Sequence, residues 1–191
     1  MTIGGISIMA TKKILLVIDV QNDFITGALR NEAAIAQLPN IVKLLKNEKF
    51  DEVHVTMDTH EKDYLETLEG KNLPVPHCIK GTDGWHMPDE VSKTKAIQNA
   101  EIYEKPTFGS VNLAQHLWAH IFNEDYANAK DYEFTIVGFC TDICVVSNAL
   151  MLRANFPNNK ITVRKDCVAG VTPETNEAAL LTMKMCQIEV I

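Results

Sequence analysis

FTIVGFCTDIC, residues 134–144, is the stretch that decides the fold. It opens with a continuous β-favouring run, Phe134 to Val137, which is typical of a strand buried on both faces of a sheet. Gly138 ends that run, and a helical pattern follows from Cys144 to Phe156. A buried strand that leads directly into a helix predicts one unit of an α/β fold.

The rest of the chain repeats this alternation of short apolar runs and amphipathic stretches. We predict further strands at residues 14–18, 52–57, 102–105, 160–164 and 188–191, and helices at 33–45, 113–122 and 173–185. Such alternation predicts a three-layer α-β-α sandwich, Rossmann-like, with a central, mostly parallel sheet. Ligands of these sheets bind beyond the carboxyl ends of the strands, so reactive side chains at those ends are the candidates for a site.

The chain has 191 residues and a formal net charge of -7. Its length predicts one domain, at residues 12–191, after an extension of residues 1–11 that we expect to be disordered or tag-like. Met1 and Met9 are both candidate starts. The first basic residues follow the apolar part of this extension, the wrong order for a secretory signal, and no apolar run approaches the ~20 residues that span a bilayer. We therefore expect a cytoplasmic protein. The negative charge argues against nucleic acid or a membrane as a partner.

Cysteines occur at positions 78, 140, 144, 167 and 186. Their number is odd, and their spacing does not suggest a disulfide framework. We expect reduced thiols, as in cytosolic proteins.

Cys144 is the candidate nucleophile. It lies just beyond the strand that ends at Gly138, in the first turn of the next predicted helix, with Thr141 or Asp142 as the N-cap. In that turn the free backbone N–H groups and the helix dipole favour a thiolate and can hold an oxyanion. The alternatives are a buried structural cysteine, or a redox or metal pair with Cys140, whose Cys-x3-Cys spacing differs from the usual Cys-x2-Cys.

Asp19 and Lys105 end two other predicted strands. Asp19 follows five apolar residues, where a carboxylate is costly unless it has a partner or a catalytic task. Lys105 precedes Pro106, which favours an extended conformation. A lysine directed into a site with Asp19 and Cys144 would pair with the carboxylate and lower the pKa of the thiol. Taken alone, Asp19 could equally be a cap, and Lys105 a solvated surface lysine.

Asp58 and His60 form an Asp-x-His pair at the end of the second strand, and His77 follows in the long polar stretch of residues 59–88. Alternate residues of an extended chain point the same way, so Asp58 and His60 can reach one ion. One carboxylate and two imidazoles suit a catalytic metal site, to which Glu66 or Glu69 could add a ligand. The alternative is a set of unrelated loop residues. His54 and His86 show no pattern that pairs them with other groups, and we expect structural or surface positions for them.

Several of these motifs together resemble one known family. VIDVQNDF (residues 17–24) resembles the first-strand signature of the isochorismatase-like cysteine hydrolases, and VGFCTDICV (137–145) resembles their nucleophile segment. PHCIKGTDG (76–84) is similar to the metal loop of the nicotinamidase branch, and Ala169-Gly170-Val171 fits the segment before the last helix. The resemblance extends in consistent order from about Lys12 to the C-terminus.

The resemblance implies a function and a set of roles. Cys144 would be the nucleophile, Asp19 the general base and Lys105 the activating cation. It implies a cis peptide between Phe139 and Cys140, and an oxyanion hole from the backbone N–H groups of Cys140 and Cys144. The remaining implied site residues are the metal ligands Asp58, His60 and His77 with Glu69 as a candidate fourth, and the pocket residues Phe24 and Phe108.

The implied cofactor is a divalent metal, zinc first, with iron or manganese as alternatives, which in nicotinamidases holds the pyridine nitrogen of the substrate. The implied reaction is hydrolysis of a small carboxamide, nicotinamide foremost, through a thioester, by a homodimer or homotetramer. One departure is Pro74, where nicotinamidases often carry Trp, so the pocket wall should differ. Other readings are a family member that acts on a carbamoyl, ureido or vinyl-ether substrate, a catalytically silent binding protein, and a redox sensor.

Overall fold

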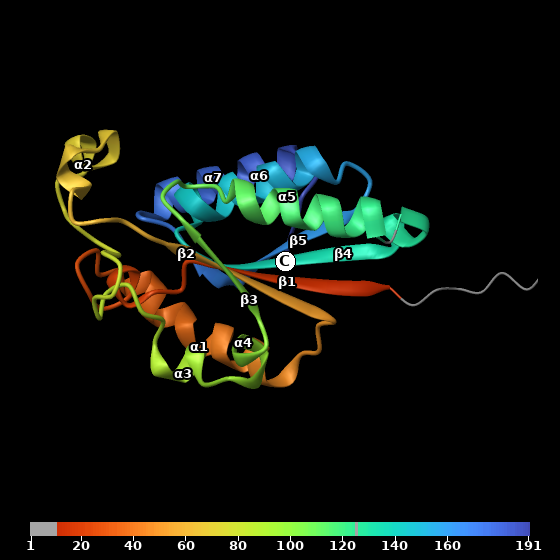
Figure 1. Ribbon diagram of the computed structural model, residues 1–191, viewed down its shortest axis with the longest axis horizontal. Coiled ribbons are helices and arrows are strands. Elements are labelled where there is room, and N and C mark those ends of the chain that lie inside the picture. The colour runs from red at the N-terminus through yellow and green to blue at the C-terminus, as the bar shows by residue number, and fades with distance from the viewer. Residues whose placement is uncertain (1–10, 125) are drawn as a thin grey trace, which may run out of the picture.

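A six-stranded, all-parallel sheet forms the centre of the computed structural model, which describes residues 11–124 and 126–191 (Figure 1). The strand order is β3-β2-β1-β4-β5-β6. The strands are β1 (Lys12–Ile18), β2 (Glu52–Asp58), β3 (Glu101–Lys105), β4 (Tyr132–Phe139), β5 (Lys160–Ala169) and β6 (Glu189–Val190).

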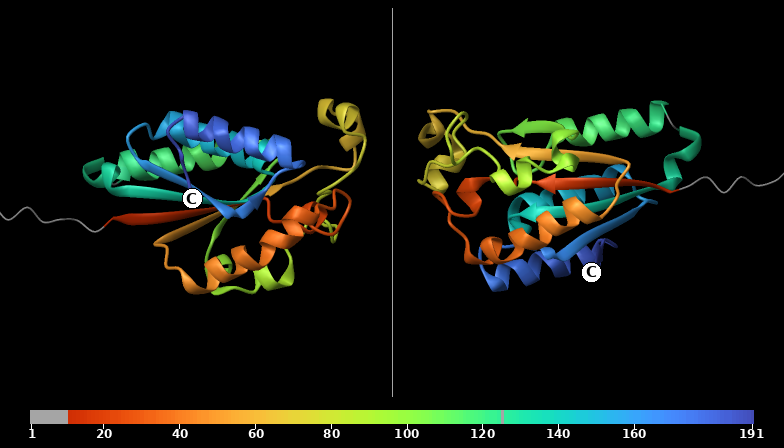
Figure 2. Two further views of the ribbon diagram at one scale, coloured as in Figure 1. Left: turned by 180° about the vertical axis from the view of Figure 1, so that it is seen from behind. Right: turned by 90° about the horizontal axis from the view of Figure 1, so that it is seen from below.

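Helices cover both faces of this sheet, which confirms the predicted three-layer α/β architecture. One face carries α1 (Glu32–Asn47), α3 (Asp89–Ser92) and α4 (Lys95–Gln98). The other face carries α5 (Val111–Ala119), α6 (Val146–Asn155) and α7 (Pro173–Met185). The short helix α2 (Leu68–Asn72) stands apart from both layers, beyond the carboxyl ends of the strands (Figure 2).

Local sequence explains where the longer helices begin. The Asn31 side chain accepts hydrogen bonds from the N–H groups of Ala33 and Ala34 and so caps α1. At the start of α7, Thr172 and Thr175 form a reciprocal capping box, with Pro173 in the first turn. Each cap satisfies backbone donors that have no partner within the helix, which is worth ~1 kcal/mol.

Strand β1 lies at the centre of the core. Its residues Ile14 to Ile18 are all fully buried, and they alternate between the two faces. Leu15 and Val17 pack in the cluster beneath α1, while Ile14, Leu16 and Ile18 pack in the cluster beneath α5, α6 and α7. Burial of each such side chain contributes roughly 1.5–3 kcal/mol.

The structure differs from the predicted elements at several places. β5 extends to Ala169 rather than to residue 164, because a register shift opposite Ile136 and Gly138 lets the strand resume pairing. Helices α2, α3 and α4, of four or five residues each, were not predicted because they are too short to show helical periodicity. α5 ends at Ala119 and passes into a π-helical turn. β6 is shorter than predicted.

The strand order reverses between β1 and β4, and the two strands come unusually close there. Gly138 has a φ of 122°, and a Cβ atom at this position would lie 1.9 Å from the carbonyl oxygen of Ile18. Only glycine tolerates both conditions. In open α/β sheets the crevice at such a reversal is the usual ligand site.

Two expectations concern the chain as a whole. The predicted extension covers residues 1–10, which lie outside the described residues, and Thr11, which precedes β1. Among the described helices, none combines the length and the apolar character that crossing a lipid bilayer requires.

Candidate active site

Four neighbouring strands deliver the candidate residues to one edge of the sheet. Asp19 directly follows β1, Asp58 ends β2, Lys105 ends β3, and Cys144 lies in the turn that follows β4. All four side chains are buried. Asp19 adopts a φ of 48°, in the left-handed region, which Asp tolerates better than most residues. The topology therefore gathers residues that are up to 125 positions apart in the sequence.

The ammonium of Lys105 lies at the centre of this group. Its Nζ is 2.6 Å from Asp19 Oδ2, 3.6 Å from Cys144 Sγ and 3.5 Å from Asp58 Oδ1. Thr56 donates a 2.7 Å hydrogen bond to the other oxygen of Asp19. The carboxylate is thus held on one side by a hydroxyl and on the other by an ammonium, with the sulfur beside it.

Burial dominates the ionisation of this group. It raises the pKa of Cys144 well above its usual 9.0, and the negative charge of Asp19 adds to the rise, while Lys105 opposes it. We expected from the sequence that Lys105 would lower the thiol pKa, and its contribution has that sign, but burial and Asp19 outweigh it. The net shift is therefore opposite in direction to the one expected from the sequence, and it favours the neutral thiol beside a potential base.

The base and the cation are shifted in ways that suit proton transfer. Burial raises the pKa of Asp19, against the lowering effect of the nearby Lys105 ammonium. Burial lowers the pKa of Lys105, but the charges of Asp19, Cys144 and Asp58 outweigh this and raise it overall. The lysine consequently stays charged, and the carboxylate gains proton affinity.

The segment before Cys144 has a special backbone. The peptide bond between Phe139 and Cys140 is cis, as the resemblance implies. The helical turn that holds Cys144 spans Thr141–Val145 and is π-type, and its N-cap residue is Cys140, without a side-chain cap. The expected N-cap, Thr141 or Asp142, is therefore wrong. The Asp142 carboxylate instead accepts the N–H of Val171 and so joins this turn to the start of α7.

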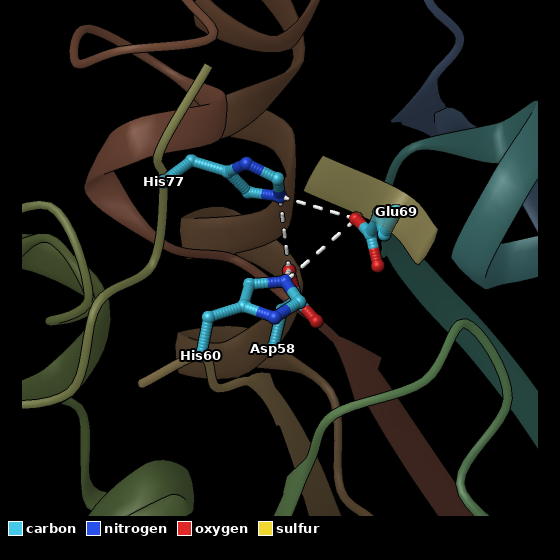
Figure 3. A group of neighbouring side chains, drawn as sticks. All are labelled: Asp58, His60, Glu69 and His77. Carbon is cyan, nitrogen blue, oxygen red and sulfur yellow. Dashed lines mark hydrogen bonds and ion pairs between the residues drawn. The ribbon is translucent and has the colours of Figure 1, made fainter. Parts of the chain in front are cut away.

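A second group of ligand-type side chains lies directly beside this one. Asp58, His60, Glu69 and His77 each direct a nitrogen or a carboxylate oxygen toward a common point (Figure 3), and these atoms lie within 4.8 Å of one another. Asp58 Oδ2 is 3.1 Å from His60 Nε2 and 3.3 Å from His77 Nε2. Glu69 Oε1, carried by α2, is 3.7 Å and 3.6 Å from the same two nitrogens.

These separations fit a metal ion. Ligand atoms about 2.1 Å from a tetrahedral zinc are about 3.4 Å apart, close to the distances within this group. Two imidazoles and two carboxylates are also the donor types that zinc, iron and manganese accept. His77 Nδ1 donates a 2.9 Å hydrogen bond to the carbonyl of Val75, which leaves Nε2 free for an ion. The residues present therefore suit the divalent metal that the sequence predicts.

The two groups face one cavity of about 1210 Å³. Its wall includes Cys140 and Cys144 on one side and Asp58, Glu69 and His77 on another. Two aromatic side chains, Phe24 and Phe108, also line it, and the Phe24 ring lies edge-on to His77 at 5.7 Å between centroids. Pro74 is exposed and does not line the cavity, whereas its neighbour Leu73 does.

Several positioning residues were missed in the sequence analysis. Gln21 receives the Asp58 N–H through its side-chain oxygen and donates to the carbonyls of Asp58 and Trp85, which locks the end of β2 to the loop. Tyr64 packs edge-on against both imidazoles of the metal group. Asn148 donates to the carbonyl of Cys144. Gln21 and Asn148 are polar residues within otherwise apolar patterns, which was a usable signal; Tyr64 offered none.

Several known proteins are similar to this chain in sequence or in fold. A nicotinamidase from Schizosaccharomyces pombe is 27% identical over 207 residues, covering 93% of this chain and 91% of that protein. The crystal structure of a nicotinamidase from Bacillus subtilis superposes with a TM-score of 0.75 at 29% identity, over 94% of this chain and 98% of that one.

A pyrazinamidase from Pyrococcus horikoshii, whose structure is a complex with zinc, has a TM-score of 0.74 at 24% identity, over 94% of this chain and 98% of that one. The family model of the isochorismatase domain matches residues 13–191. Because this match spans nearly the whole sequence, the chain belongs to the isochorismatase family.

Proposed function

We propose that this chain is an amidohydrolase that cleaves a small aromatic carboxamide, with nicotinamide as the leading candidate, to the carboxylic acid and ammonia. One observation carries the proposal: the buried ammonium of Lys105 lies between the carboxylate of Asp19 and the thiol of Cys144, and Cys144 lines a cavity whose wall also includes metal-ligand side chains. The similar nicotinamidases support this choice of substrate class.

In the first half of the reaction, Asp19 takes the thiol proton as Cys144 Sγ attacks the amide carbonyl. The raised pKa of Asp19 favours this transfer, and Lys105 stabilises the developing charge. We assign the backbone N–H groups of Cys140 and Cys144 as donors to the oxyanion. Asp19 then returns the proton to the departing nitrogen, so ammonia leaves and a thioester remains on Cys144.

In the second half, a water molecule attacks the thioester carbonyl. Asp19 again acts as the base and passes the proton to the sulfur, which releases the acid and restores the thiol. The hydrogen bond from Thr56 keeps Asp19 aimed in one direction through both halves. The position of this carboxylate, at the fully buried end of β1, limits competing protonation from bulk water.

Asp58, His60, His77 and Glu69 would hold a zinc-class ion, which would supply a Lewis-acidic position for a ring nitrogen of the substrate. Phe24 and Phe108 form apolar walls suited to an aromatic ring. The cavity exceeds the roughly 300–1,000 Å³ of common ligand pockets, so substituted rings should also enter.

A panel of small amides, assayed for ammonia with and without a chelator, tests the proposal. It should include nicotinamide, pyrazinamide, benzamide (which lacks the ring nitrogen) and an N-carbamoyl amino acid. We expect the two heteroaromatic amides to be the best substrates, with rates that fall on chelation and recover with zinc. Release of ammonia only from the carbamoyl compound would move the chain to another branch of the family, and absence of any turnover would contradict an amidase.

We also propose that the chain forms a homodimer or homotetramer, as the family resemblance implies, and that it is cytoplasmic, as expected from its sequence. Light scattering coupled to size-exclusion chromatography would give the number of chains. A monomer at assay concentration would contradict the proposed assembly without affecting the proposed chemistry.

A further inference from the structure

A separate cluster of two histidines and one carboxylate, here called the His54 cluster, lies near the amino ends of strands β2 and β3, away from the active site. His54 is on β2, Glu101 is at the start of β3, and His116 is on α5. The described side chains of this group offer ligand atoms that all lie within 4.8 Å of one another. The chemistry proposed above uses none of these residues.

The register of the sheet explains why the group forms. β2 and β3 pair in parallel, with His54 opposite Glu101 and Asp58 opposite Lys105. Residues two apart on a strand point to the same face, so one face carries the active site at its carboxyl end and the His54 cluster at its amino end. His54 and Asp58 are four positions apart along β2, about 13 Å. The His54 cluster is therefore distinct from the active site.

The donor atoms have the spacing of a metal site. Glu101 Oε2 is 3.2 Å from His116 Nε2 and 3.7 Å from His54 Nδ1. These values bracket the separation of about 3.4 Å expected for ligands about 2.1 Å from a tetrahedral ion. The Tyr103 hydroxyl, 3.3 Å from His54 Nδ1, is the group that an ion would displace.

The surroundings of His54 favour ligation. Its side chain is only 4% exposed, and its second ring nitrogen, Nε2, is 3.3 Å from a carboxylate oxygen of Glu52. A carboxylate in that position holds the proton on Nε2 and leaves Nδ1 with a lone pair, the usual outer partner of a metal-bound imidazole. His120 lies 3.1 Å from the other Glu52 oxygen, one turn beyond His116, and steadies this carboxylate.

We propose that His54, Glu101 and His116 bind one divalent transition-metal ion of the zinc class. Imidazole and carboxylate donors suit zinc and its neighbours better than magnesium or calcium. The side chains of Glu101 and His116 are 51% and 40% exposed, so an ion reaches them from solvent. They line a surface cavity of about 850 Å³, which leaves room for water at the fourth position. The bound ion joins the edge strand β3 and helix α5 to β2.

Zinc counts on a set of variants test this site separately from the first one. The chelator-stripped full chain is dialysed against micromolar zinc and its metal content is measured by elemental analysis. We expect two ions per chain for the wild type. His116→Ala and Glu101→Gln should each bind one, and the exposed His86→Ala is the matched control that keeps two. The double variant His60→Ala/His77→Ala should keep one, and adding His116→Ala should remove it.

Thermal melting gives an independent readout. Zinc should raise the melting temperature of His60→Ala/His77→Ala by several degrees and leave the same chain with His116→Ala unchanged, because only the former has the second site. Alanine favours helix, so His116→Ala should fold, and Glu101→Gln checks the result with little change in shape.

If the wild type bound a single ion and His60→Ala/His77→Ala bound none, the proposal would be overturned. His54, Glu101 and His116 would then form only an ion-pair network. A count unchanged by His116→Ala would do the same. Failure to release ammonia from the panel of small amides would count against the proposed active site, not against this second metal site.

Discussion

The catalytic group and the metal group meet in one cavity, but the fold positions them in different ways. Asp19 and Lys105 sit at the ends of sheet strands and Cys144 in the turn after one, and none is more than 5% exposed. Of the metal group, only Asp58 ends a strand, while Glu69 lies on the isolated helix α2 with its side chain 21% exposed. The sheet topology is sufficient to assemble the first group. The second depends on the course of a long loop, and we expect it to be the more tolerant of change.

The largest effect should come from the catalytic group. Cys144→Ala removes the nucleophile and should lower kcat for nicotinamide by ~10⁵-fold or more, while the chain stays folded. Ammonia release measures the loss, and circular dichroism checks the fold. Cys186→Ala, a half-buried thiol outside the cavity, is the control and should keep full activity. Comparable loss in both variants would mean that cysteine oxidation or unfolding, and not chemistry, explains the result.

Asp19→Asn should separate base catalysis from simple electrostatics. Hydrolysis should fall by about 10³-fold because the proton acceptor is gone. Alkylation of Cys144 by iodoacetamide should become faster, because the charge that helps raise the thiol pKa has been removed. In the wild type, the alkylation rate should climb from about pH 7 to about pH 9 without a plateau, since the raised pKa keeps the thiol protonated over that range. A plateau near neutral pH would show a resting thiolate and contradict the raised pKa of Cys144.

Lys105→Met should show how far the stability of the fold depends on the buried ion pair between Asp19 and Lys105. Asp19 would remain buried without its cation, which should cost about 3–5 kcal/mol in the free energy of unfolding, measured with urea. The double variant Asp19→Asn/Lys105→Met should recover much of that loss, since neither charge is then left alone. Additive losses in the double variant would mean that the two side chains act independently.

The smallest effects should come from substitutions in the metal group, and the loss of zinc affinity should differ from one ligand to another. His77→Ala should weaken zinc binding by at least about 100-fold, whereas Glu69→Gln, on the exposed helix, should weaken it by about tenfold. Isothermal titration with zinc gives both values. If Glu69→Gln were the more damaging of the two, α2 would be a rigid part of the site rather than its adjustable side.

The same contrast explains what could be predicted from the sequence. Strands with continuous apolar runs, such as residues 14–18, identified the sheet, and the rule that ligands gather at carboxyl ends selected Asp19, Lys105 and Cys144 as neighbours. The π-helical turn and the missing side-chain cap at Cys140 were not predictable, because hydrogen-bonding preferences suggested Thr141 or Asp142 instead. The raised thiol pKa also escaped prediction, since it depends on burial that only the packed structure shows.

The partners of His54 were missed for a related reason. Its neighbours Glu101 and His116 lie 47 and 62 positions further along the chain. Glu101 is on the edge strand β3, and His116 is on helix α5. Neither spacing has a local pattern. A pairing of this kind becomes visible only when the parallel register of β2 and β3 is known.

Asp58 belongs to both groups at once, since one of its oxygens faces Lys105 and the other faces the two imidazoles. An ion in the metal group would draw the negative charge of this carboxylate away from the ammonium. Capture of the substrate ring and tuning of the nucleophile would then share a single side chain. A chain stripped of its ion should accordingly be impaired even on benzamide, which has no ring nitrogen to offer.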